Sequence, residues 1–261
     1  TYKLAINKFS DLTNDEFRQR YLSFKEEINT ELSFLASKSY FDLHADDDEE
    51  PKVATPAEGI DYSENFGPVK DQGSCGSCWA FASIGAIEGN YSRKFGKDLR
   101  FAEQQLVDCS PYTNGCRGSS PNSALRYVLE SGIAYENSYE YVSGMTRSAN
   151  TCRYKEVKSN FILSGTKTCN SRTCTRALVR QYLSEGPLAS LIDGEGNGIF
   201  KSYSSGVIDM PCTEDNHAII MTGLGYDENR REYYRGRNSW GNDWGENGYF
   251  RLYVRDSDKS C

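Results

Sequence analysis

Three residues with the chemistry of a nucleophilic catalytic site lie far apart in this sequence: Cys78, His217 and Asn238. A thiolate can attack a carbonyl carbon, an imidazole can carry protons, and a carboxamide can hold the imidazole in place. The chain has nine cysteines, which allow four disulfides and one free thiol. We assign the free thiol to Cys78 and predict a Cys-His-Asn site.

The sequences around these residues are more specific than the residues alone. Cys78 lies in Gln72-Gly73-Ser74-Cys75-Gly76-Ser77-Cys78-Trp79, His217 in Asn216-His217-Ala218, and Asn238 in Asn238-Ser239-Trp240-Gly241. Cys-Gly-Ser-Cys-Trp with a later His and Asn is the known signature of papain and the cathepsins. With Glu103-Gln104-Gln105 and Gly245–Tyr249 matching in the same order, the chain resembles the papain family of cysteine proteases from about Ile60 to Cys261.

This resemblance implies a role for each catalytic residue. Cys78 would be a thiolate at the start of a helix, stabilised by the helix dipole and by a positively charged His217. Asn238 would orient the His217 ring, and Trp240 would shield that hydrogen bond from water. The Gln72 side chain and the Cys78 backbone N–H would bind the oxyanion.

The resemblance also implies which residues contact a peptide substrate. They are Gly76, Gly118, Ser119, Ser120, Pro121, Leu191, Asn216, Ala218 and Trp240. Ser119 stands where the family usually has the second of two glycines, so a Cβ there could crowd the peptide or demand a strained backbone. We expect an apolar and shallow pocket for the second side chain before the cleaved bond.

The family pattern implies the disulfides Cys75–Cys116, Cys109–Cys152 and Cys212–Cys261, and leaves Cys169–Cys174 as a further pair. Sequence alone allows many other pairings. A redox Cys-x-x-Cys at Cys75 and Cys78 would require a βαβ context, which the sequence does not predict. A zinc site is disfavoured because the chain has only two histidines and no second Cys-x-x-Cys. We therefore expect neither metal nor cofactor.

Composition limits the class of protein. The 261 residues carry a net charge of −7, and residues 1–53 account for most of it. No basic stripe suggests nucleic-acid binding, and no run of about 18 apolar residues could span a membrane. Paired cysteines and the acceptor pattern Asn90-Tyr91-Ser92 indicate a glycosylated protein of the secretory route, in a lysosome or vacuole or outside the cell. We expect a monomer.

The order of elements predicts an α+β protein with two lobes. Helical patterns cover Ser77 to about Phe95, Ser120 to Gly132 and Thr175 to Glu185. Strand patterns cover Leu188–Ile192, His217–Leu224, Arg231–Arg237 and Gly248–Val254. The resemblance implies a helical lobe, mainly residues 75–185, and a β-barrel-like lobe, mainly residues 186–261, with the cleft between them. Together they form a peptidase domain over residues 54–261.

Residues 1–53 have the features of a separate unit. Thr13-Asn14-Asp15-Glu16 is a capping box, after which Phe17, Tyr21 and Phe24 recur at helical spacing. Ala5–Asp11 resembles the Asn-x-Phe-x-Asp stretch of papain-family propeptides. The resemblance implies that this segment blocks the cleft as an intramolecular inhibitor. The run from His44 to Pro51 is predicted to be a solvated acidic linker. Because Thr1 is not an initiator methionine, we expect the chain to be part of a longer precursor.

These patterns favour a cysteine endopeptidase in a zymogen-like form that acts on peptides or proteins. An alternative with the same fold is a weak or inactive homologue that binds peptides, suggested by Ser119-Ser120. A disulfide-rich structural protein of the secretory route would not need Gln72, His217 and Asn238 in this order.

Overall fold

A computed structural model describes residues 1–22, 59–154, 161, 163–169, 174–210 and 214–255 of the chain. The predicted acidic linker, Phe24, Cys212 and Cys261 lie outside the described residues, so the expected Cys212–Cys261 disulfide stays a prediction.

Three of the described α-helices begin at residues whose side chains accept hydrogen bonds from the first turn. Thr13 Oγ1 accepts from the backbone N–H of Glu16, and the Glu16 side chain accepts from the backbone N–H of Thr13, so the predicted capping box is present. The side chains of Ser120 and Thr175 cap two later helices by accepting the backbone N–H groups of Ser123 and Leu178. The α-helices are α1 (Asn14–Tyr21), α2 (Cys78–Phe95), α3 (Glu103–Cys109), α4 (Pro121–Ser131), α5 (Ser143–Thr146) and α6 (Arg176–Glu185). Short 3₁₀ turns are η2 (Ser63–Asn65), η3 (Gly115–Arg117), η4 (Glu136–Ser138) and η5 (Gly196–Gly198).

The strands form one mixed sheet in the order β1-β4-β7-β6-β5-β2, and β3 also pairs with β5. They are β1 (Tyr2–Leu4), β2 (Ile60–Asp61), β3 (Leu188–Ile192), β4 (Tyr203–Ile208), β5 (His217–Tyr226), β6 (Glu232–Arg237) and β7 (Tyr249–Tyr253). Over the described residues this order does not close on itself, so the expected barrel-like lobe is an open, strongly paired sheet. The predicted α+β class is confirmed.

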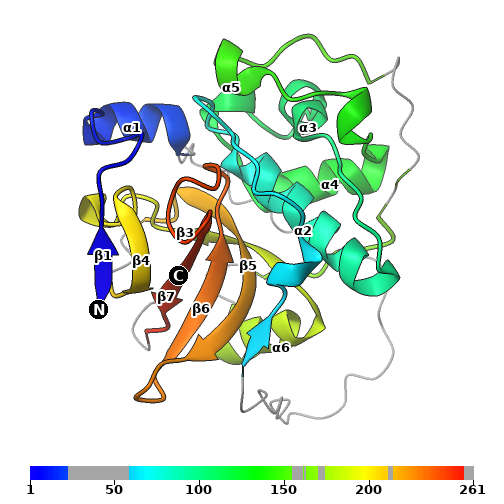
Figure 1. Cartoon of the computed structure of the whole chain (residues 1–261). Helices are drawn as coiled ribbons and strands as arrows, with labels where there is room; N and C mark the ends of the chain where they lie inside the picture. The colour runs from blue at the N-terminus through cyan, green and yellow to red at the C-terminus, as the bar shows by residue number, and fades with distance from the viewer. Residues whose placement is uncertain (23–58, 155–160, 162, 170–173, 211–213, 256–261) are drawn as a thin grey trace.

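Two hydrophobic cores define two lobes, which Figure 1 shows side by side. One core surrounds α2 and contains Trp79, Ile84 and Leu106. The other lies against the sheet and contains Phe200 and Trp240. The lobes meet where α2 packs against β5. At Gly85 of α2, an added Cβ would lie 2.0 Å from Cδ1 of Ile220, so only glycine lets the helix and strand approach this closely.

Helix α6 lies on a different lobe from the one expected. Leu183 of α6 is fully buried in the sheet core, and Val179 packs against that core. Arg176 and Arg180 pair with Glu232 of β6. The boundary between the lobes therefore precedes α6, and does not fall at residue 186. Helical periodicity showed which face of α6 is apolar but not which core receives it.

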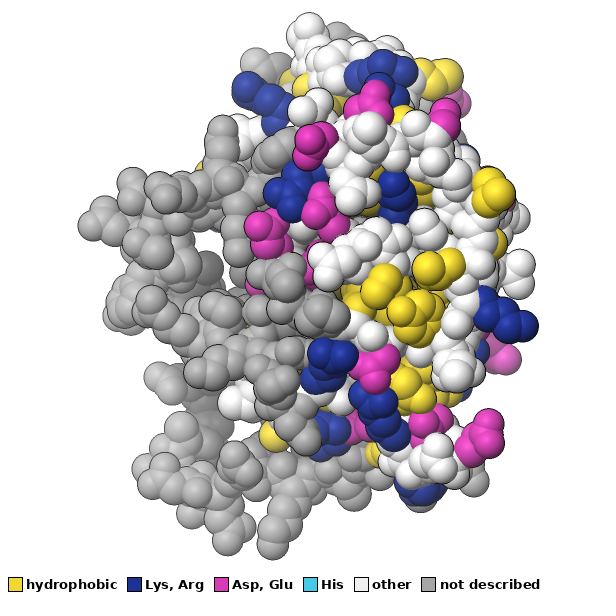
Figure 2. All heavy atoms as spheres, turned by 90° about the vertical axis from the view of Figure 1, so that its left-hand side faces the viewer, with side chains coloured by type: hydrophobic (Ala, Val, Ile, Leu, Met, Phe, Trp, Pro, Cys, Tyr) yellow, Lys and Arg dark blue, Asp and Glu magenta, His cyan; other side chains and the backbone are white. Residues whose placement is uncertain are grey.

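Residues 1–22 pack onto the sheet lobe and extend its sheet. Strand β1 pairs antiparallel with β4, and α1 crosses the end of the same lobe (Figure 1). Phe9, Phe17 and Leu22 are at most 1% exposed and belong to the sheet core. Figure 2 shows the face that carries this segment, where basic and acidic side chains alternate around apolar ones. Leu4 and Ile6 are apolar residues of the segment that remain exposed.

Candidate active site

Cys78 is the first residue of α2 and is completely buried. It is the one free cysteine among the described residues, as the sequence predicts. Its Sγ accepts a hydrogen bond from the backbone N–H of Ala218 at 3.4 Å. Ala218 directly follows His217 on β5, so this contact places the thiol of one lobe against the start of the strand that carries His217. The start of a helix also favours a negative charge on the sulfur.

His217 and Asn238 form a hydrogen-bonded pair on adjacent strand ends. His217 Nε2 lies 2.8 Å from Asn238 Oδ1, and the same oxygen accepts the backbone N–H of Ser239 at 2.8 Å. Because the Ser239 N–H can only donate, its partner on Asn238 is the oxygen. His217 Nε2 therefore carries the proton in this pair. Nδ1 is buried and has no hydrogen-bond partner in the described part of the chain, so it is the atom left to exchange a proton.

Burial sets the charge of the His217 ring. The ring is fully buried, with Trp240 tilted against it at 4.6 Å between ring centroids and Phe200 at 6.0 Å. Burial lowers the pKa of His217 to about 4, although the hydrogen bond to Asn238 raises it. In this form the ring is neutral above about pH 4. This differs from the thiolate–imidazolium pair expected from the sequence, because burial of the ring disfavours its charged form.

Gln72 lies at the junction of both lobes and is fully buried. Its Oε1 accepts the Ser239 hydroxyl at 2.6 Å, which fixes the orientation of the amide. Its Nε2 then donates to two carbonyl oxygens, those of Cys75 and Tyr21, each at 2.9 Å. Tyr21 belongs to α1. The amide that the resemblance assigns to the oxyanion thus binds a backbone carbonyl of the N-terminal segment.

The N-terminal segment also contacts this site through Leu22. A Cβ added to Gly76 would meet the Leu22 carbonyl oxygen at 2.7 Å. One added to Gly194 would meet Leu22 Cδ2 at 2.7 Å and His217 Cβ at 2.6 Å. Leu22 therefore fills the space between the two lobes beside His217. No sequence pattern pointed to Leu22 itself, although the apolar spacing of Phe17 and Tyr21 indicated a buried face of α1.

Phe9 and Phe17 cover Trp240. Their ring centroids lie 5.1 and 5.2 Å from that of Trp240, both edge-on. Trp240 is itself fully buried. The Trp240 ring is thus packed between His217 and the two Phe rings of the N-terminal segment.

Several of the residues expected to bind substrate have structural contacts of their own. Ser120 caps α4 and Pro121 is its first residue, so both have a structural task. Leu191 pairs with Ala218 across β3 and β5 and is half-buried, which places both on the sheet side of the cleft. Asn216 Oδ1 accepts the backbone N–H of Gly194 at 2.8 Å.

Ser119 lies beside Gly118, whose φ is +105°. The non-glycine residues with positive φ in the described chain are Arg147, Asn197, Arg230 and Asn247. Ser119 is not among them, so its side chain causes no backbone strain of the kind that glycine relieves.

The described part of the chain contains three disulfides: Cys75–Cys116, Cys109–Cys152 and Cys169–Cys174. The first joins the loop before Cys78 to the turn η3, where the Gly76 N–H also donates to the Cys116 carbonyl at 2.9 Å. Asn90, the expected glycosylation site, is exposed on α2. Its Nδ2 donates to the carbonyls of Ala86 and Pro187, both at 2.8 Å. A glycan on this nitrogen would replace one of these bonds.

Within the ranges that the structure describes, no group of three or more His, Cys, Asp or Glu side chains is arranged to hold a metal. The same ranges contain no helix that is long and apolar enough to cross a membrane.

Comparisons with known proteins place this geometry in a family. Residues 57–261 match the family described as papain family cysteine protease. Ananain from Ananas comosus is 35% identical over 272 residues, covering 100% of this chain and 71% of that protein. A cysteine proteinase from Theileria parva is 35% identical over 267 residues, covering 96% of this chain but 58% of its own length.

Solved structures give the same assignment. The proform of the ragweed pollen allergen Amb a 11, a cysteine protease, superposes with a TM-score of 0.78 at 34% identity. That match covers 99% of this chain and 77% of the other. Recombinant stem bromelain precursor gives a TM-score of 0.80 at 30% identity, covering 99% and 78% of the two chains. The chain belongs to the papain family of cysteine proteases and has the papain-like α+β fold.

Proposed function

We propose that this chain is a cysteine endopeptidase in a form whose N-terminal segment covers its own active site. The observation that carries the proposal is the alignment of three groups across the two lobes. His217 Nε2 is bound to Asn238 at 2.8 Å, and the residue after His217 donates its backbone N–H to Cys78 Sγ at 3.4 Å. This leaves Nδ1 of His217 as the proton acceptor for the thiol.

The reaction would run through a covalent acyl-enzyme. Cys78 gives its proton to Nδ1 of His217, and the thiolate attacks the peptide carbonyl carbon. The tetrahedral intermediate collapses as His217 returns the proton to the leaving amine, which breaks the C–N bond and leaves a thioester on Cys78. Water, deprotonated by His217, then attacks the thioester, and the second product leaves as a carboxylic acid.

The Gln72 amide is the best-placed donor for the oxyanion. Its orientation is fixed by the Ser239 hydroxyl, so Nε2 does not have to reorganise when negative charge develops. By family resemblance, the backbone N–H of Cys78 would be the second donor.

The same amide supports the inhibitory role of the N-terminal segment. While Gln72 Nε2 donates to the Tyr21 carbonyl and Leu22 lies beside His217, a substrate carbonyl has no access to this donor. Arg18 of α1 fixes the segment further, because its Nε and Nη2 donate to Glu195 at 2.6 and 2.7 Å. We infer that residues 1–53 act as an intramolecular inhibitor and that residues 54–261 form the peptidase.

Peptides or proteins are the proposed substrates. Leu191, Ala218 and Pro121 would form apolar walls of the pocket for the second side chain before the cleaved bond. Three disulfides fit an oxidising compartment of the secretory route. The names of the relatives, a precursor and a proform among them, fit a protease made in a covered form.

A peptidyl epoxide tests this proposal because it alkylates an activated thiolate. After limited proteolysis of the N-terminal segment, the epoxide should label Cys78 stoichiometrically and abolish cleavage of an unstructured peptide. The intact chain at neutral pH should be labelled much more slowly. Mass spectrometry of the tryptic peptide that contains Cys78 gives the readout.

Cys78→Ser is the control variant, since it keeps the size of the side chain but not the nucleophile. Peptide cleavage by the Cys78→Ser protein, or no labelling of the processed wild type at any pH between about 4 and 8, would contradict the proposal.

A further inference from the structure

A small pocket lies between the two lobes, directly behind the catalytic residues. Its volume is about 20 Å³. Glu103, Glu88 and Lys70 line it on the helical side, and Asn238, Ser239 and Arg237 line it on the sheet side. A space that admits about 10–15 Å³ of water-sized probe volume can hold one water molecule, provided that polar groups face it. This pocket is therefore large enough for one water molecule.

Two buried polar atoms of the pocket residues have no hydrogen-bond partner within the described chain. They are Glu103 Oε2 and Asn238 Nδ2, on side chains whose residues are 1% and 3% exposed. The other oxygen of Glu103 accepts the Lys70 ammonium at 2.7 Å, and the other end of Asn238 holds His217. A buried polar atom without a partner costs about 1–3 kcal/mol. One is an acceptor and the other a donor, and both residues line the same pocket, so a water molecule there has a complementary partner on each lobe.

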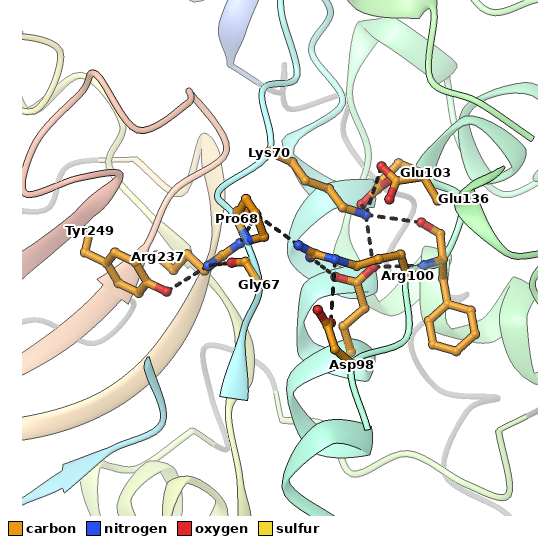
Figure 3. A network of polar contacts seen from close by, with 11 residues as sticks. Gly67, Pro68, Lys70, Asp98, Arg100, Glu103, Glu136, Arg237 and Tyr249 are labelled. Carbon is orange, nitrogen blue, oxygen red and sulfur yellow. Dashed lines mark hydrogen bonds and ion pairs between the residues drawn. The ribbon is translucent and has the colours of Figure 1, made fainter. Parts of the chain in front are cut away.

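The charges around Glu103 keep its side chain fixed. Figure 3 shows Lys70 reaching Glu103 while Arg100 and Arg237 bind neighbouring groups. The Lys70 ammonium also binds Glu88 Oε1 at 2.9 Å and lies 3.5 Å from Glu136.

The surrounding charges also affect the ionisation of Glu103. Burial is the main cause that raises the pKa of Glu103 to about 7, and Glu88 adds to it, while Lys70 opposes it. Whether protonated or ionised, the carboxyl group has an oxygen that can accept a hydrogen bond from water.

We propose that a buried water molecule in this pocket joins the Glu103 carboxyl group to the side-chain amide of Asn238. Glu103 is then a positioning residue: it restrains Asn238, and through Asn238 the ring of His217, without touching the substrate. The proposal rests on the proposed peptidase function for its kinetic consequence but not for the water itself. The proposal thus gives a role to the buried Glu103, which lies on the lobe of Cys78. Glu103 acts on the His217–Asn238 pair of the other lobe.

A high-resolution crystal structure of the intact chain tests the water site directly. We expect one ordered water within hydrogen-bond distance of both Glu103 Oε2 and Asn238 Nδ2. A pocket without that water, or a water that contacts only one of the two atoms, overturns the proposal. This result does not depend on whether the protein cleaves peptides, so it separates failure of this proposal from failure of the proposed function.

Kinetics of the chain after proteolytic activation test the positioning role. Glu103→Leu removes the acceptor and should lower kcat about fivefold, as expected for one lost hydrogen bond of about 1 kcal/mol, with KM unchanged within about twofold. Glu103→Gln keeps a hydrogen-bonding group toward the water and should retain kcat within about twofold of the wild type. If Glu103→Leu does not fold, the crystal structures of the wild type and Glu103→Gln decide.

Glu88→Gln is the matched control. Glu88 binds the same Lys70 ammonium, but its two oxygens are bonded to Lys70, Phe101 N–H and Arg100. We expect lower stability and an unchanged kcat. If Glu88→Gln lowers kcat as much as Glu103→Leu, or if the two Glu103 variants have equal kcat, the effect belongs to the charge network and the positioning role is wrong.

Discussion

The two ends of the Asn238 side chain are in different environments, and this difference predicts how the residue acts. Its oxygen accepts hydrogen bonds from the N–H at His217 Nε2 and from the Ser239 backbone N–H. It therefore fixes the tautomer and the direction of the imidazole. Asn238→Ala leaves the ring able to rotate but leaves the substrate pocket unchanged. We expect kcat to fall tenfold or more, because a lost buried hydrogen bond costs about 1–3 kcal/mol, while KM stays within about twofold.

Steady-state cleavage of a fluorogenic peptide by the activated protein measures both constants. Asn242→Ala, at an exposed asparagine nearby in the same loop region, should behave as the wild type. Equal kcat for Asn238→Ala and wild type would exclude an orienting role for this amide.

The side chains of the predicted catalytic site could be identified from the sequence. The sequences around Cys78, His217 and Asn238 were specific enough to name each of them. The contact between the Tyr21 carbonyl and Gln72 could not be predicted, because every residue has a backbone carbonyl and its position depends on how α1 docks. The neutral state of His217 was missed for a related reason: burial under Trp240 and Leu22 is a property of the folded chain.

Helix α1 packs on the sheet lobe through an aromatic side chain, Phe17, beside the ion pair of Arg18 with Glu195. Phe17 is fully buried, stacks near Tyr21 at 5.5 Å and contacts Trp240 at 5.2 Å. Burial of Phe side chains in cores contributes about 3–5 kcal/mol relative to Ala. Phe17→Ala should therefore weaken docking strongly, so that the intact chain reacts with the epoxide at neutral pH at a rate near that of the processed protein.

Gln19→Ala lies on the exposed face of the same helix and serves as its control. It should leave the labelling rate of the intact chain unchanged. Equal protection of Cys78 in the Phe17→Ala and wild-type chains would show that α1 does not hold the segment in place.

Elements with strong signals were predicted to within a residue or two, and short ones were missed. The cap and proline at Ser120-Pro121 located α4, and the mainly apolar run at Leu188–Ile192 after Gly186-Pro187 located β3. Strand β1 was missed because three residues are too few for a strand pattern to be recognised, and they form a strand through pairing with β4. For α6, the amphipathic pattern was correct but did not tell which lobe it covers.

At the scale of the whole molecule, burial of His217 makes the stability of the covered form depend on pH. The pKa of His217 is lowered to about 4 in the folded chain, against 6.5 for an exposed imidazole. The unfolded chain therefore binds more protons between these values. This contribution to stability is complete above about pH 6.5 and is lost as the pH falls toward 4. From this ring alone, the free energy of unfolding should fall by about 2 kcal/mol between pH 7.5 and pH 5.

Denaturant unfolding of the intact chain at both pH values measures this change, and NMR titration measures the pKa. The chain has two histidines, so His44→Gln leaves His217 as the single imidazole signal. In a His217→Gln variant, the loss of stability between the two pH values should be smaller by the same amount. A His217 signal that titrates near 6.5 in the intact chain would refute the burial argument.

The pairing of β1 with β4 has a consequence for the protein once residues 1–22 are removed. β4 would then lie at the end of an open sheet, with the backbone groups that had bonded to Tyr2 and Lys3 turned to solvent. Unpaired edge strands accept extended segments from other chains. The activated protein should therefore self-associate more readily than its covered form, and a peptide with the sequence of residues 1–22, added separately, should suppress that association.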